Sequence, residues 1–256
     1  MSEAARVQMV PFRIESWART HQGCVRDHNE DGYCAREAQG LWAVADGMGG
    51  HEGGEWASAQ LVEKLEAVET DGGLDSACSA VTEAIARANR TILAEAGKRR
   101  KQMGSTIVAL VVHDQDYAVL WVGDSRAYVL RDGELIQLSR DHTQVQEMVE
   151  RGILSAEDAV NHPMGHILSR AVGVQEEVKV DRVDGQVVPG DIFLLCSDGL
   201  HGYVEEREIR QMLARGSPEK ASEDLVERTL ANGAPDNVTV IAVWASEPTL
   251  LSLPDR

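Results

Sequence analysis

Short apolar runs that stop at turn-forming residues recur along the chain, and they predict β-strands. Most of them are rich in β-branched and aromatic residues, which favour extended backbone. The run at 127–130 leads into Asp132-Gly133, a pair typical of a hairpin turn. The predicted strands cover residues 41–45, 105–112, 117–123, 127–130, 135–138, 178–184, 191–197 and 237–244.

Segments with helical periodicity lie between these strands. Apolar residues such as Val81, Ile85 and Ile92 fall on one helical stripe, and Ser217 followed by Pro218 is a typical helix start. The predicted helices cover residues 54–68, 74–96, 143–152, 204–214 and 217–231. Because the helices come in pairs and the strands cluster with hairpin turns, we predict an α+β layered fold of mainly antiparallel sheets flanked by helices.

The composition fits one globular domain. The chain has 256 residues, 43% hydrophobic and 26% charged, so it can bury a large core and is not intrinsically disordered. Its four cysteines are irregularly spaced and form no CxxC pair, which argues against a disulfide framework or a cysteine zinc site. We predict a single domain over residues 1–256, with its core at about 12–246 and short terminal tails.

The charge balance is strongly acidic. Lys and Arg total 25 against 42 Asp and Glu, a net charge of −17, which disfavours nucleic acid as a partner. No apolar run approaches the ~20 residues of a membrane helix, and the N-terminus does not resemble a secretory signal. We therefore expect a cytoplasmic protein that binds neither nucleic acid nor membrane. The charge permits a cation-binding carboxylate cluster, but a solvated acidic surface would also explain it.

Four aspartates stand at the ends of apolar strands. Asp46, Asp124 and Asp198 each follow a predicted strand, and Asp236 precedes one. If these ends converge, the crowded carboxylates need cations, and hard oxygen ligands select Mg²⁺ or Mn²⁺. The carbonyl of Gly47 is a further candidate ligand, because glycine lets a backbone approach closely. Asp-Gly after a strand is also common turn chemistry, so spacing alone leaves both interpretations open.

Six further segments, each with turn-forming or acidic residues, follow one another along the chain. They are GCVRDHNEDGY (23–33), VADGMGGHEGGEWAS (44–58), MGSTIVAL (103–110), VGDSRAYVLRDGEL (122–135), LLCSDGL (194–200) and APDNVTV (234–240). Together they resemble the metal-dependent protein serine/threonine phosphatases of the protein phosphatase 2C type, and the small bacterial members most of all. The resemblance extends over about residues 17–245. It implies a four-layer sandwich in which two stacked, mainly antiparallel β-sheets are flanked by pairs of α-helices.

The same resemblance implies roles for individual residues at a centre of two to three Mn²⁺ or Mg²⁺ ions. Arg26 corresponds to the arginine that binds the substrate phosphate, a task that suits its planar guanidinium. Asp124 corresponds to the residue that completes a third metal site together with Asp198. The remaining implied metal residues are Asp46, the Gly47 carbonyl, Asp198 and Asp236 as direct ligands, and Glu30 and Asp31 through water.

The implied reaction is hydrolysis of phosphoserine and phosphothreonine on proteins. A water activated between two divalent ions attacks phosphorus in line with the departing oxygen, and no phosphoenzyme forms. The leaving alkoxide needs a proton. Many eukaryotic relatives carry His directly after the Asp-Gly pair, but this chain has Met48, which cannot donate. His51 and a water on the third metal are the candidate acids, and we expect no single side chain to be obligatory.

Residues 141–173, called the flap segment below, resemble the family's mobile flap beside the cleft. Its His162, His166 and Arg170 are either substrate contacts or parts of a polar loop. The motif LLCSDGL offers Cys196 and Ser197 as nucleophiles, but it lacks the G-x-S-x-G elbow, so we expect both to pack beneath Asp198.

Three functions compete on these observations. The first is an active metal-dependent phosphoprotein phosphatase, favoured because every expected metal position is filled. The second is a catalytically weak binding or regulatory module, and the third is a serine- or cysteine-based hydrolase that would ignore EDTA. For the first, the expected partners are phosphorylated Ser/Thr proteins and a cognate Ser/Thr kinase, with the chain itself a monomer.

Overall fold

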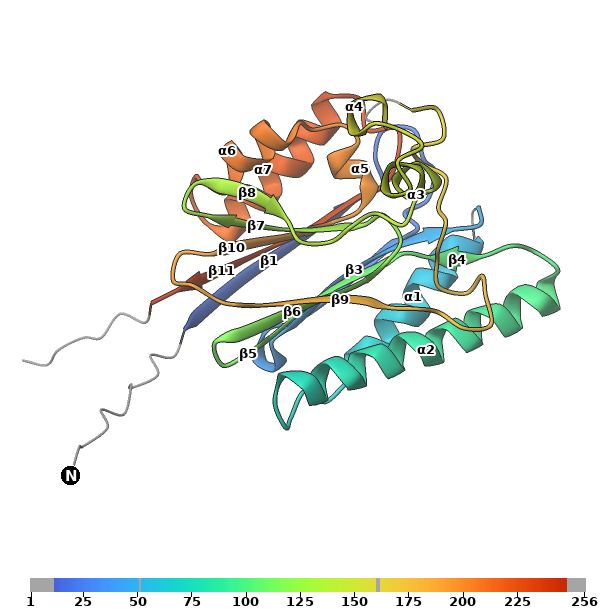
Figure 1. The fold of residues 1–256 in the computed structure, drawn as a ribbon, viewed down its shortest axis with the longest axis horizontal. Helices are drawn as coiled ribbons and strands as arrows, with labels where there is room; N and C mark the ends of the chain where they lie inside the picture. Colours follow the sequence, from blue (N-terminus) through green and yellow to red (C-terminus); the bar gives the residue numbers. More distant parts are fainter. Residues whose placement is uncertain (1–11, 51, 160–161, 248–256) are drawn as a thin grey trace, which may run out of the picture.

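Two antiparallel sheets stacked face to face form the centre of the molecule, with helices on both outer faces (Figure 1). The computed structural model describes residues 12–50, 52–159 and 162–247. This arrangement confirms the predicted α+β sandwich of two mainly antiparallel sheets flanked by helix pairs.

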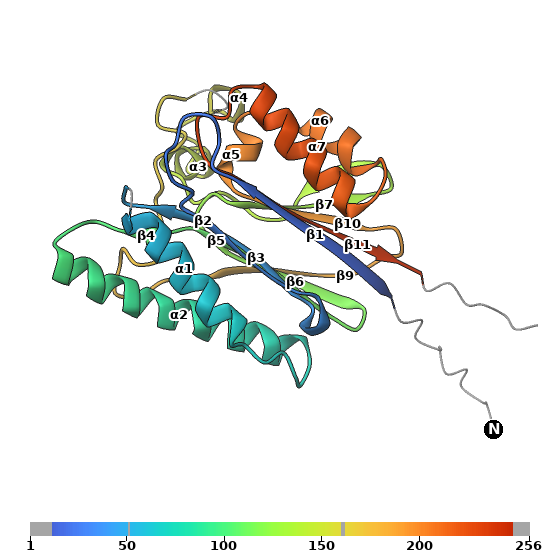
Figure 2. The ribbon, with the colours of Figure 1, turned by 180° about the vertical axis from the view of Figure 1, so that it is seen from behind.

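The first sheet has the strand order β1-β11-β10-β7-β8, and every neighbouring pair in it is antiparallel. β1 lies beside β11 along the edge seen from behind (Figure 2). The strands are β1 (Arg13–His21), β7 (Arg126–Arg131), β8 (Glu134–Gln137), β10 (Ile192–Cys196) and β11 (Val238–Ser246).

The second sheet has the order β2-β3-β5-β6-β9, with the short β4 paired to the end of β3. All its pairs are antiparallel as well. The strands are β2 (Asp31–Arg36), β3 (Leu41–Met48), β4 (Gly104–Ser105), β5 (Ile107–His113), β6 (Asp116–Val122) and β9 (Asp181–Gln186).

Helix pairs cover the outer faces of both sheets. α1 and α2 pack against the second sheet, and α6 and α7 against the first, while α3 and α4 belong to the flap segment. Ser217 caps α7 by accepting from the Lys220 N–H, as its sequence predicts. No helix in the part of the chain that the structure describes is long and apolar enough to cross a bilayer. The helices are α1 (Glu52–Glu66), α2 (Leu74–Arg99), α3 (Gln144–Glu150), α4 (Ala156–Ala159), α5 (Asp198–His201), α6 (Glu206–Leu213) and α7 (Pro218–Ala231), with a 3₁₀ turn, η1 (Glu37–Gln39).

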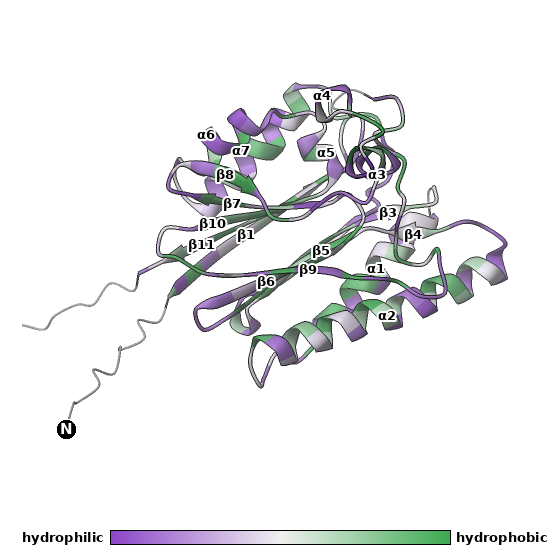
Figure 3. Cartoon of the chain, in the orientation of Figure 1, coloured by the Kyte–Doolittle hydropathy of each residue, from purple (hydrophilic) through white to green (hydrophobic). Residues whose placement is uncertain are grey.

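Three apolar interfaces hold the four layers together. One lies between α1, α2 and the second sheet, one between the two sheets, and one between the first sheet and α6 and α7. The apolar residues of the strands lie between the layers, and the polar residues of the helices face outward (Figure 3). Burying a large apolar side chain contributes ~1.5–3 kcal/mol. These interfaces therefore provide a rigid frame for the strand ends.

The predicted strands correspond well to the observed ones, with four main differences. The run predicted as one strand at 105–112 is divided at Thr106 into β4 and β5. β1 and β2 were not predicted from the sequence. The strand predicted at 178–184 begins at Asp181 and runs to Gln186, because Val178 and Val180 pack against the helix-side core before the ladder starts.

Candidate metal centre

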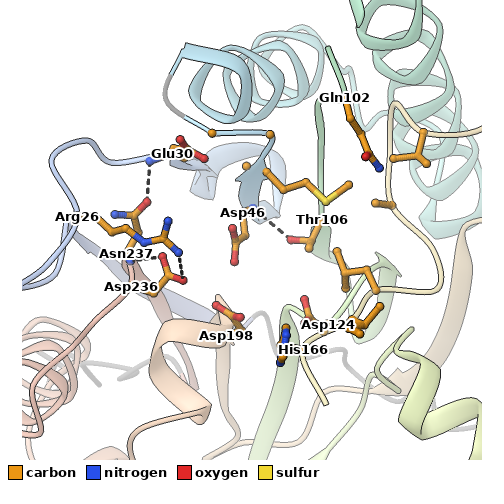
Figure 4. A pocket seen from close by; sticks show the side chains of 18 of the residues that line it. Arg26, Glu30, Asp46, Gln102, Thr106, Asp124, His166, Asp198, Asp236 and Asn237 are labelled. Carbon is orange, nitrogen blue, oxygen red and sulfur yellow. Dashed lines mark hydrogen bonds and ion pairs between the residues drawn. The ribbon is translucent and has the colours of Figure 1, made fainter. Parts of the chain in front are cut away.

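Strand ends from both sheets meet at one open cavity of about 700 Å³. The four aspartates singled out from the sequence all line it, and their carboxylates surround a common space (Figure 4). Asp46 comes from β3, Asp124 from the turn after β6, Asp198 from the start of α5, and Asp236 from the loop before β11. The predicted convergence of these side chains therefore appears in the folded chain.

Strand pairing and one glycine place the carboxylates close to one another. Asp31 stands opposite Asp46 in the β2–β3 ladder, so the two side chains share one face of the second sheet. At the end of the first sheet, Gly199 of α5 lies so close to the residue before β11 that a Cβ on it would be 1.9 Å from the Asn237 carbonyl oxygen. That contact brings the end of β10 to the beginning of β11, with Asp198 beside Asp236.

Gly47 sits in an equally close contact. Its N–H donates to the Glu30 carbonyl at 3.1 Å, and a Cβ on it would be 2.2 Å from the Gly54 carbonyl oxygen. Glu30 and Gly47 thus lie next to each other at the wall of the cavity, which both residues line. An alanine at position 47 would separate β3 from α1.

The backbone of Asp46 is fixed by hydroxyl groups that the sequence analysis did not single out. Ser105 Oγ donates to the Asp46 carbonyl at 2.9 Å, and Thr106 Oγ1 accepts from its N–H at 3.1 Å. Thr106 also donates its own N–H to the Asp46 carbonyl at 2.8 Å. Both residues belong to the segment MGSTIVAL, in which a Ser-Thr pair directly before an apolar run is the only sequence signal.

Asn237 ties the loop that carries Arg26 and Glu30 to β11. Its Oδ1 accepts from the Glu30 N–H, and its Nδ2 donates to the carbonyls of Gln22 and His28. The Asn237 N–H also donates to Asp236 Oδ1 at 2.9 Å. The asparagine of the PDN motif therefore positions two segments that are more than 200 residues apart.

A partly buried histidine holds the Asp124 backbone. His201 Nε2 lies 3.0 Å from the Asp124 carbonyl oxygen, so the ring donates from Nε2. Burial lowers the pKa of His201 to about 4, with a further contribution from nearby Arg126. The ring is therefore neutral at pH 7 and keeps this tautomer.

The carboxylates raise one another's pKa values. Burial is the largest cause of the raised pKa of Asp46, followed by the charges of Asp31 and Asp198. Burial also raises the pKa of Asp31 to about 7. The pKa values of Asp124 and Asp198 are raised first by burial and then by a neighbouring carboxylate. Such a group of anions is costly unless protons or cations neutralise it.

The donor set fits hard divalent cations. It consists of carboxylate and carbonyl oxygens, which suit Mg²⁺ and Mn²⁺ better than zinc. Asp31 Oδ1 is buried and has no hydrogen-bond partner. In the described ranges, no three or more His, Cys, Asp or Glu side chains are placed so that they could hold a metal ion by themselves. Mg²⁺-type ions keep several waters and take only one or two carboxylates each, so an open arrangement suits them.

Arg26 lies at the rim of the same cavity. Its Nη2 donates to Asp236 Oδ2 at 2.7 Å, and 54% of its side chain is exposed. The bond to Asp236 raises the pKa of Arg26, so its positive charge is secure. A cationic fork beside a carboxylate cluster can orient an anion that enters from solvent.

The flap segment contributes only some of its predicted residues to the cavity. His166 and Arg170 line it, whereas His162 is absent from its lining and accepts from the Met164 N–H within a turn. Arg170 Nη1 bonds to Asp181 Oδ1 at 3.0 Å, which ties the flap to β9. His51 lies outside the described residues.

Neither alternative nucleophile is set up for attack. Cys196 is completely buried, and burial raises the pKa of its thiol to about 12. Ser197 Oγ donates to Asp31 Oδ2 and accepts from the Thr239 N–H. As predicted, both pack beneath Asp198, so the serine- or cysteine-based hydrolase is disfavoured.

Comparison with known proteins matches most of this chain to one family model. The family model described as Protein phosphatase 2C matches residues 21–232. The serine/threonine phosphatase stp of Listeria monocytogenes is 38% identical over 236 residues, covering 88% of this chain and 93% of its own length. The serine/threonine protein phosphatase PstP of Mycobacterium tuberculosis is 35% identical over 239 residues, or 93% of this chain. Only 45% of PstP takes part in that match, so the chain spans about half of its length.

A solved structure extends the likeness to the fold. The catalytic domain of PstP, in complex with two manganese ions, superposes with a TM-score of 0.82 at 33% identity. That match covers 91% of this chain and 99% of the solved domain.

Proposed function

This chain belongs to the protein phosphatase 2C family, and we propose that it is a metal-dependent phosphoprotein phosphatase acting on phosphoserine and phosphothreonine. The observation that carries the proposal is the meeting of Asp46, Asp198 and Asp236 in one cavity beside Arg26. A phosphate monoester is an anion, and it can approach these carboxylates only when cations lie between them. A neutral substrate would have no charge with which to interact with these cations or with Arg26.

We assign the residues around two or three Mn²⁺ or Mg²⁺ ions. Asp46, Asp198, Asp236 and the Gly47 carbonyl would be direct ligands, Asp124 would complete a third site with Asp198, and Glu30 and Asp31 would act through water. When bound, the ions would lower the pKa of an attacking water and neutralise charge on the phosphate. The two manganese ions of the PstP catalytic domain support this assignment.

The chain's own part in the reaction is to bind, orient and position. Arg26 would present two N–H groups to two phosphate oxygens. Asp46, whose backbone is fixed by Ser105 and Thr106, would stay in place while substrate and product exchange at the site. The general acid stays a prediction, in which no single side chain is obligatory.

The substrate is expected to be a protein segment. The cavity is open and is lined both by the Arg26 loop and by the flap residues His166 and Arg170, so an extended phosphorylated loop can enter it. We further propose a single catalytic domain over about 12–246, a monomeric state, a cytoplasmic location and a cognate Ser/Thr kinase.

Loss of a carboxylate ligand tests the proposal. We expect the wild-type chain to hydrolyse p-nitrophenyl phosphate and a phosphothreonine peptide with Mn²⁺, and to stop when EDTA is added. Asp46→Asn and Asp198→Asn should abolish turnover while the circular dichroism spectrum stays native, because removing a repelling charge does not unfold the metal-stripped protein.

Asp116→Asn is the matched control, since Asp116 is an exposed aspartate at the opposite end of β6. It should retain wild-type activity. EDTA-resistant turnover would contradict the proposal and support a serine- or cysteine-based hydrolase. Tight Mn²⁺ binding without any turnover would instead support the regulatory binding module.

A further inference from the structure

The two carboxylate oxygens of Asp31 have different surroundings. Oδ2 accepts hydrogen bonds from Thr239 Oγ1 at 2.7 Å and from Ser197 Oγ at 2.9 Å. Oδ1 is buried and has no hydrogen-bond partner. Asp31 stands opposite Asp46 in the β2–β3 ladder, and its charge acts on Asp46, so the residue lies next to the metal centre.

The hydroxyl that holds Oδ2 is one link in a closed ring of hydrogen bonds. Thr239 donates to the carboxylate, so it accepts from Thr20, whose Oγ1 lies 2.7 Å away. Thr20 in turn accepts from Asn29 Nδ2 at 2.8 Å. Asn29 Oδ1 closes the ring by accepting the Asp31 N–H at 3.1 Å. One orientation of the Asn29 amide satisfies both of its bonds, so the direction of every link is set.

The ring joins the two sheets at the edge of the cavity. Thr20 and Thr239 face each other in the β1–β11 ladder of the first sheet, while Asp31 begins β2 in the second. Ser197 links the same two residues a second time, because its Oγ accepts from the Thr239 N–H at 3.0 Å and donates to Asp31 Oδ2. Thr239 and Ser197 are completely buried, so water does not compete for these bonds.

We propose that Thr239 and Ser197, supported by Thr20 and Asn29, are positioning residues that anchor one oxygen of Asp31 and leave the other for the divalent cation centre. The inference rests on the proposed metal-dependent function. Neither Asp31 nor these four residues line the cavity, so the four act through Asp31, which itself would act through water, and they are not catalytic. Groups that orient metal-site ligands in this way typically change metal affinity or activity by about 10- to 100-fold when they are removed.

The test measures Mn²⁺ affinity directly, by isothermal titration calorimetry on folded protein. Thr239→Val keeps the side-chain shape but removes the donor, and we expect Mn²⁺ to bind about 10-fold more weakly or worse. Ser197→Ala should weaken binding in the same direction and serves as a second variant if the first fails to fold. Thr239→Ser restores the hydroxyl and should restore the affinity.

Thr229→Val is the matched control. Thr229 is also completely buried, but its hydroxyl donates to the Leu225 carbonyl within α7, away from the site. Its Mn²⁺ affinity should equal that of the wild type. With a phosphopeptide, Thr239→Val should lower kcat with little change in KM, because Arg26 is untouched.

Three outcomes separate this inference from the proposed function. If the wild-type protein neither binds Mn²⁺ nor hydrolyses phosphate esters, both the proposed function and the positioning role are wrong. A functional wild type whose Thr239→Val and Ser197→Ala variants bind Mn²⁺ normally overturns the positioning role alone. An equal loss of affinity in Thr229→Val also overturns it, because the effect would then be general destabilisation.

Discussion

Arg26 and Asp236 form the contact in which phosphate binding and metal binding meet. The guanidinium has five N–H donors and uses one of them for Asp236 Oδ2. Asp236 in turn receives the Arg26 donor on Oδ2 and the Asn237 N–H on Oδ1. The residue proposed to bind phosphate is thus held directly beside a proposed metal ligand. The position of the bound phosphate and that of the metal ion would therefore depend on the same contact.

Arg26→Lys should weaken substrate binding more than it slows the chemical step. Lys keeps the charge but not the planar fork, so one charged hydrogen bond is lost, which is worth ~1.5–3 kcal/mol or about 10- to 100-fold. We expect that loss mainly in KM for a phosphothreonine peptide under steady-state conditions. Arg13→Lys, at the exposed start of β1, should be neutral. An unchanged KM with a lower kcat would show that Arg26 acts on the reaction and not on binding.

The roles of some residues can be predicted from the sequence, and the roles of others cannot. Asp46 and Asp198 stand out because each ends an apolar run and precedes a glycine. Thr239 and Thr20 do not, because a threonine in a strand is ordinary, and the ring that they form joins positions 219 residues apart. The carboxylates could therefore be predicted, whereas the hydroxyls that orient them required the tertiary structure.

Among the secondary-structure elements, the flap segment is joined to the site through His142. Its Nδ1 accepts the Gly123 N–H at 3.0 Å, so Nε2 carries the proton and donates to Asp181 of β9. Its backbone N–H donates to the Gly123 carbonyl, and its carbonyl accepts from Ser169 near the end of the flap. Burial, and then the charge of Arg170, lower the pKa of His142, which keeps the ring neutral. One side chain thus links the flap, β9 and the turn before Asp124.

His142→Ala should loosen the flap without unfolding the sandwich. The buried Gly123 N–H loses its acceptor, which costs ~1–3 kcal/mol. We expect residues 144–170 to be cleaved faster in limited proteolysis and their amide hydrogens to exchange faster, while the core strands keep wild-type protection. His113→Ala, on a partly exposed histidine at the end of β5, is the control. Wild-type flap protection in His142→Ala would show that other contacts hold this segment.

Elements with one clear apolar pattern could be predicted, and those without it could not. β1 alternates, but its inward positions include Ser16, Ala18 and Thr20, so the apolar signal is weak. β2 begins with Asp31-Gly32 at the site and has little apolar character of its own. Both are edge strands whose formation depends on partners distant in the chain, β11 and β3.

At the scale of the whole molecule, the apolar layers compensate for a cluster of anions at one edge. The chain carries a net charge of −17, and the cavity concentrates carboxylates that repel one another. Such a cluster would be unfavourable in a loosely packed protein, but three apolar interfaces fix the strands that carry it. Divalent cations should therefore stabilise the fold as well as support the reaction.

Metal binding and proton binding should compete. Burial raises the pKa of Asp31 to about 7, against about 3.9 in an unfolded chain, and Asp46 is shifted in the same direction. The folded, metal-stripped protein thus binds protons more tightly than the unfolded chain. The stability that these protons contribute is complete below about pH 4 and is lost as pH rises through about 7.

In EDTA, the Tm should fall between pH 5 and 8, whereas saturating Mn²⁺ should raise the Tm more at pH 8 than at pH 5. Titration of Mn²⁺ at pH 6 in two buffers of different protonation enthalpy should reveal proton release, and Asp46→Asn should reduce it. A Tm increment from Mn²⁺ that is larger at pH 5 than at pH 8 would contradict this linkage.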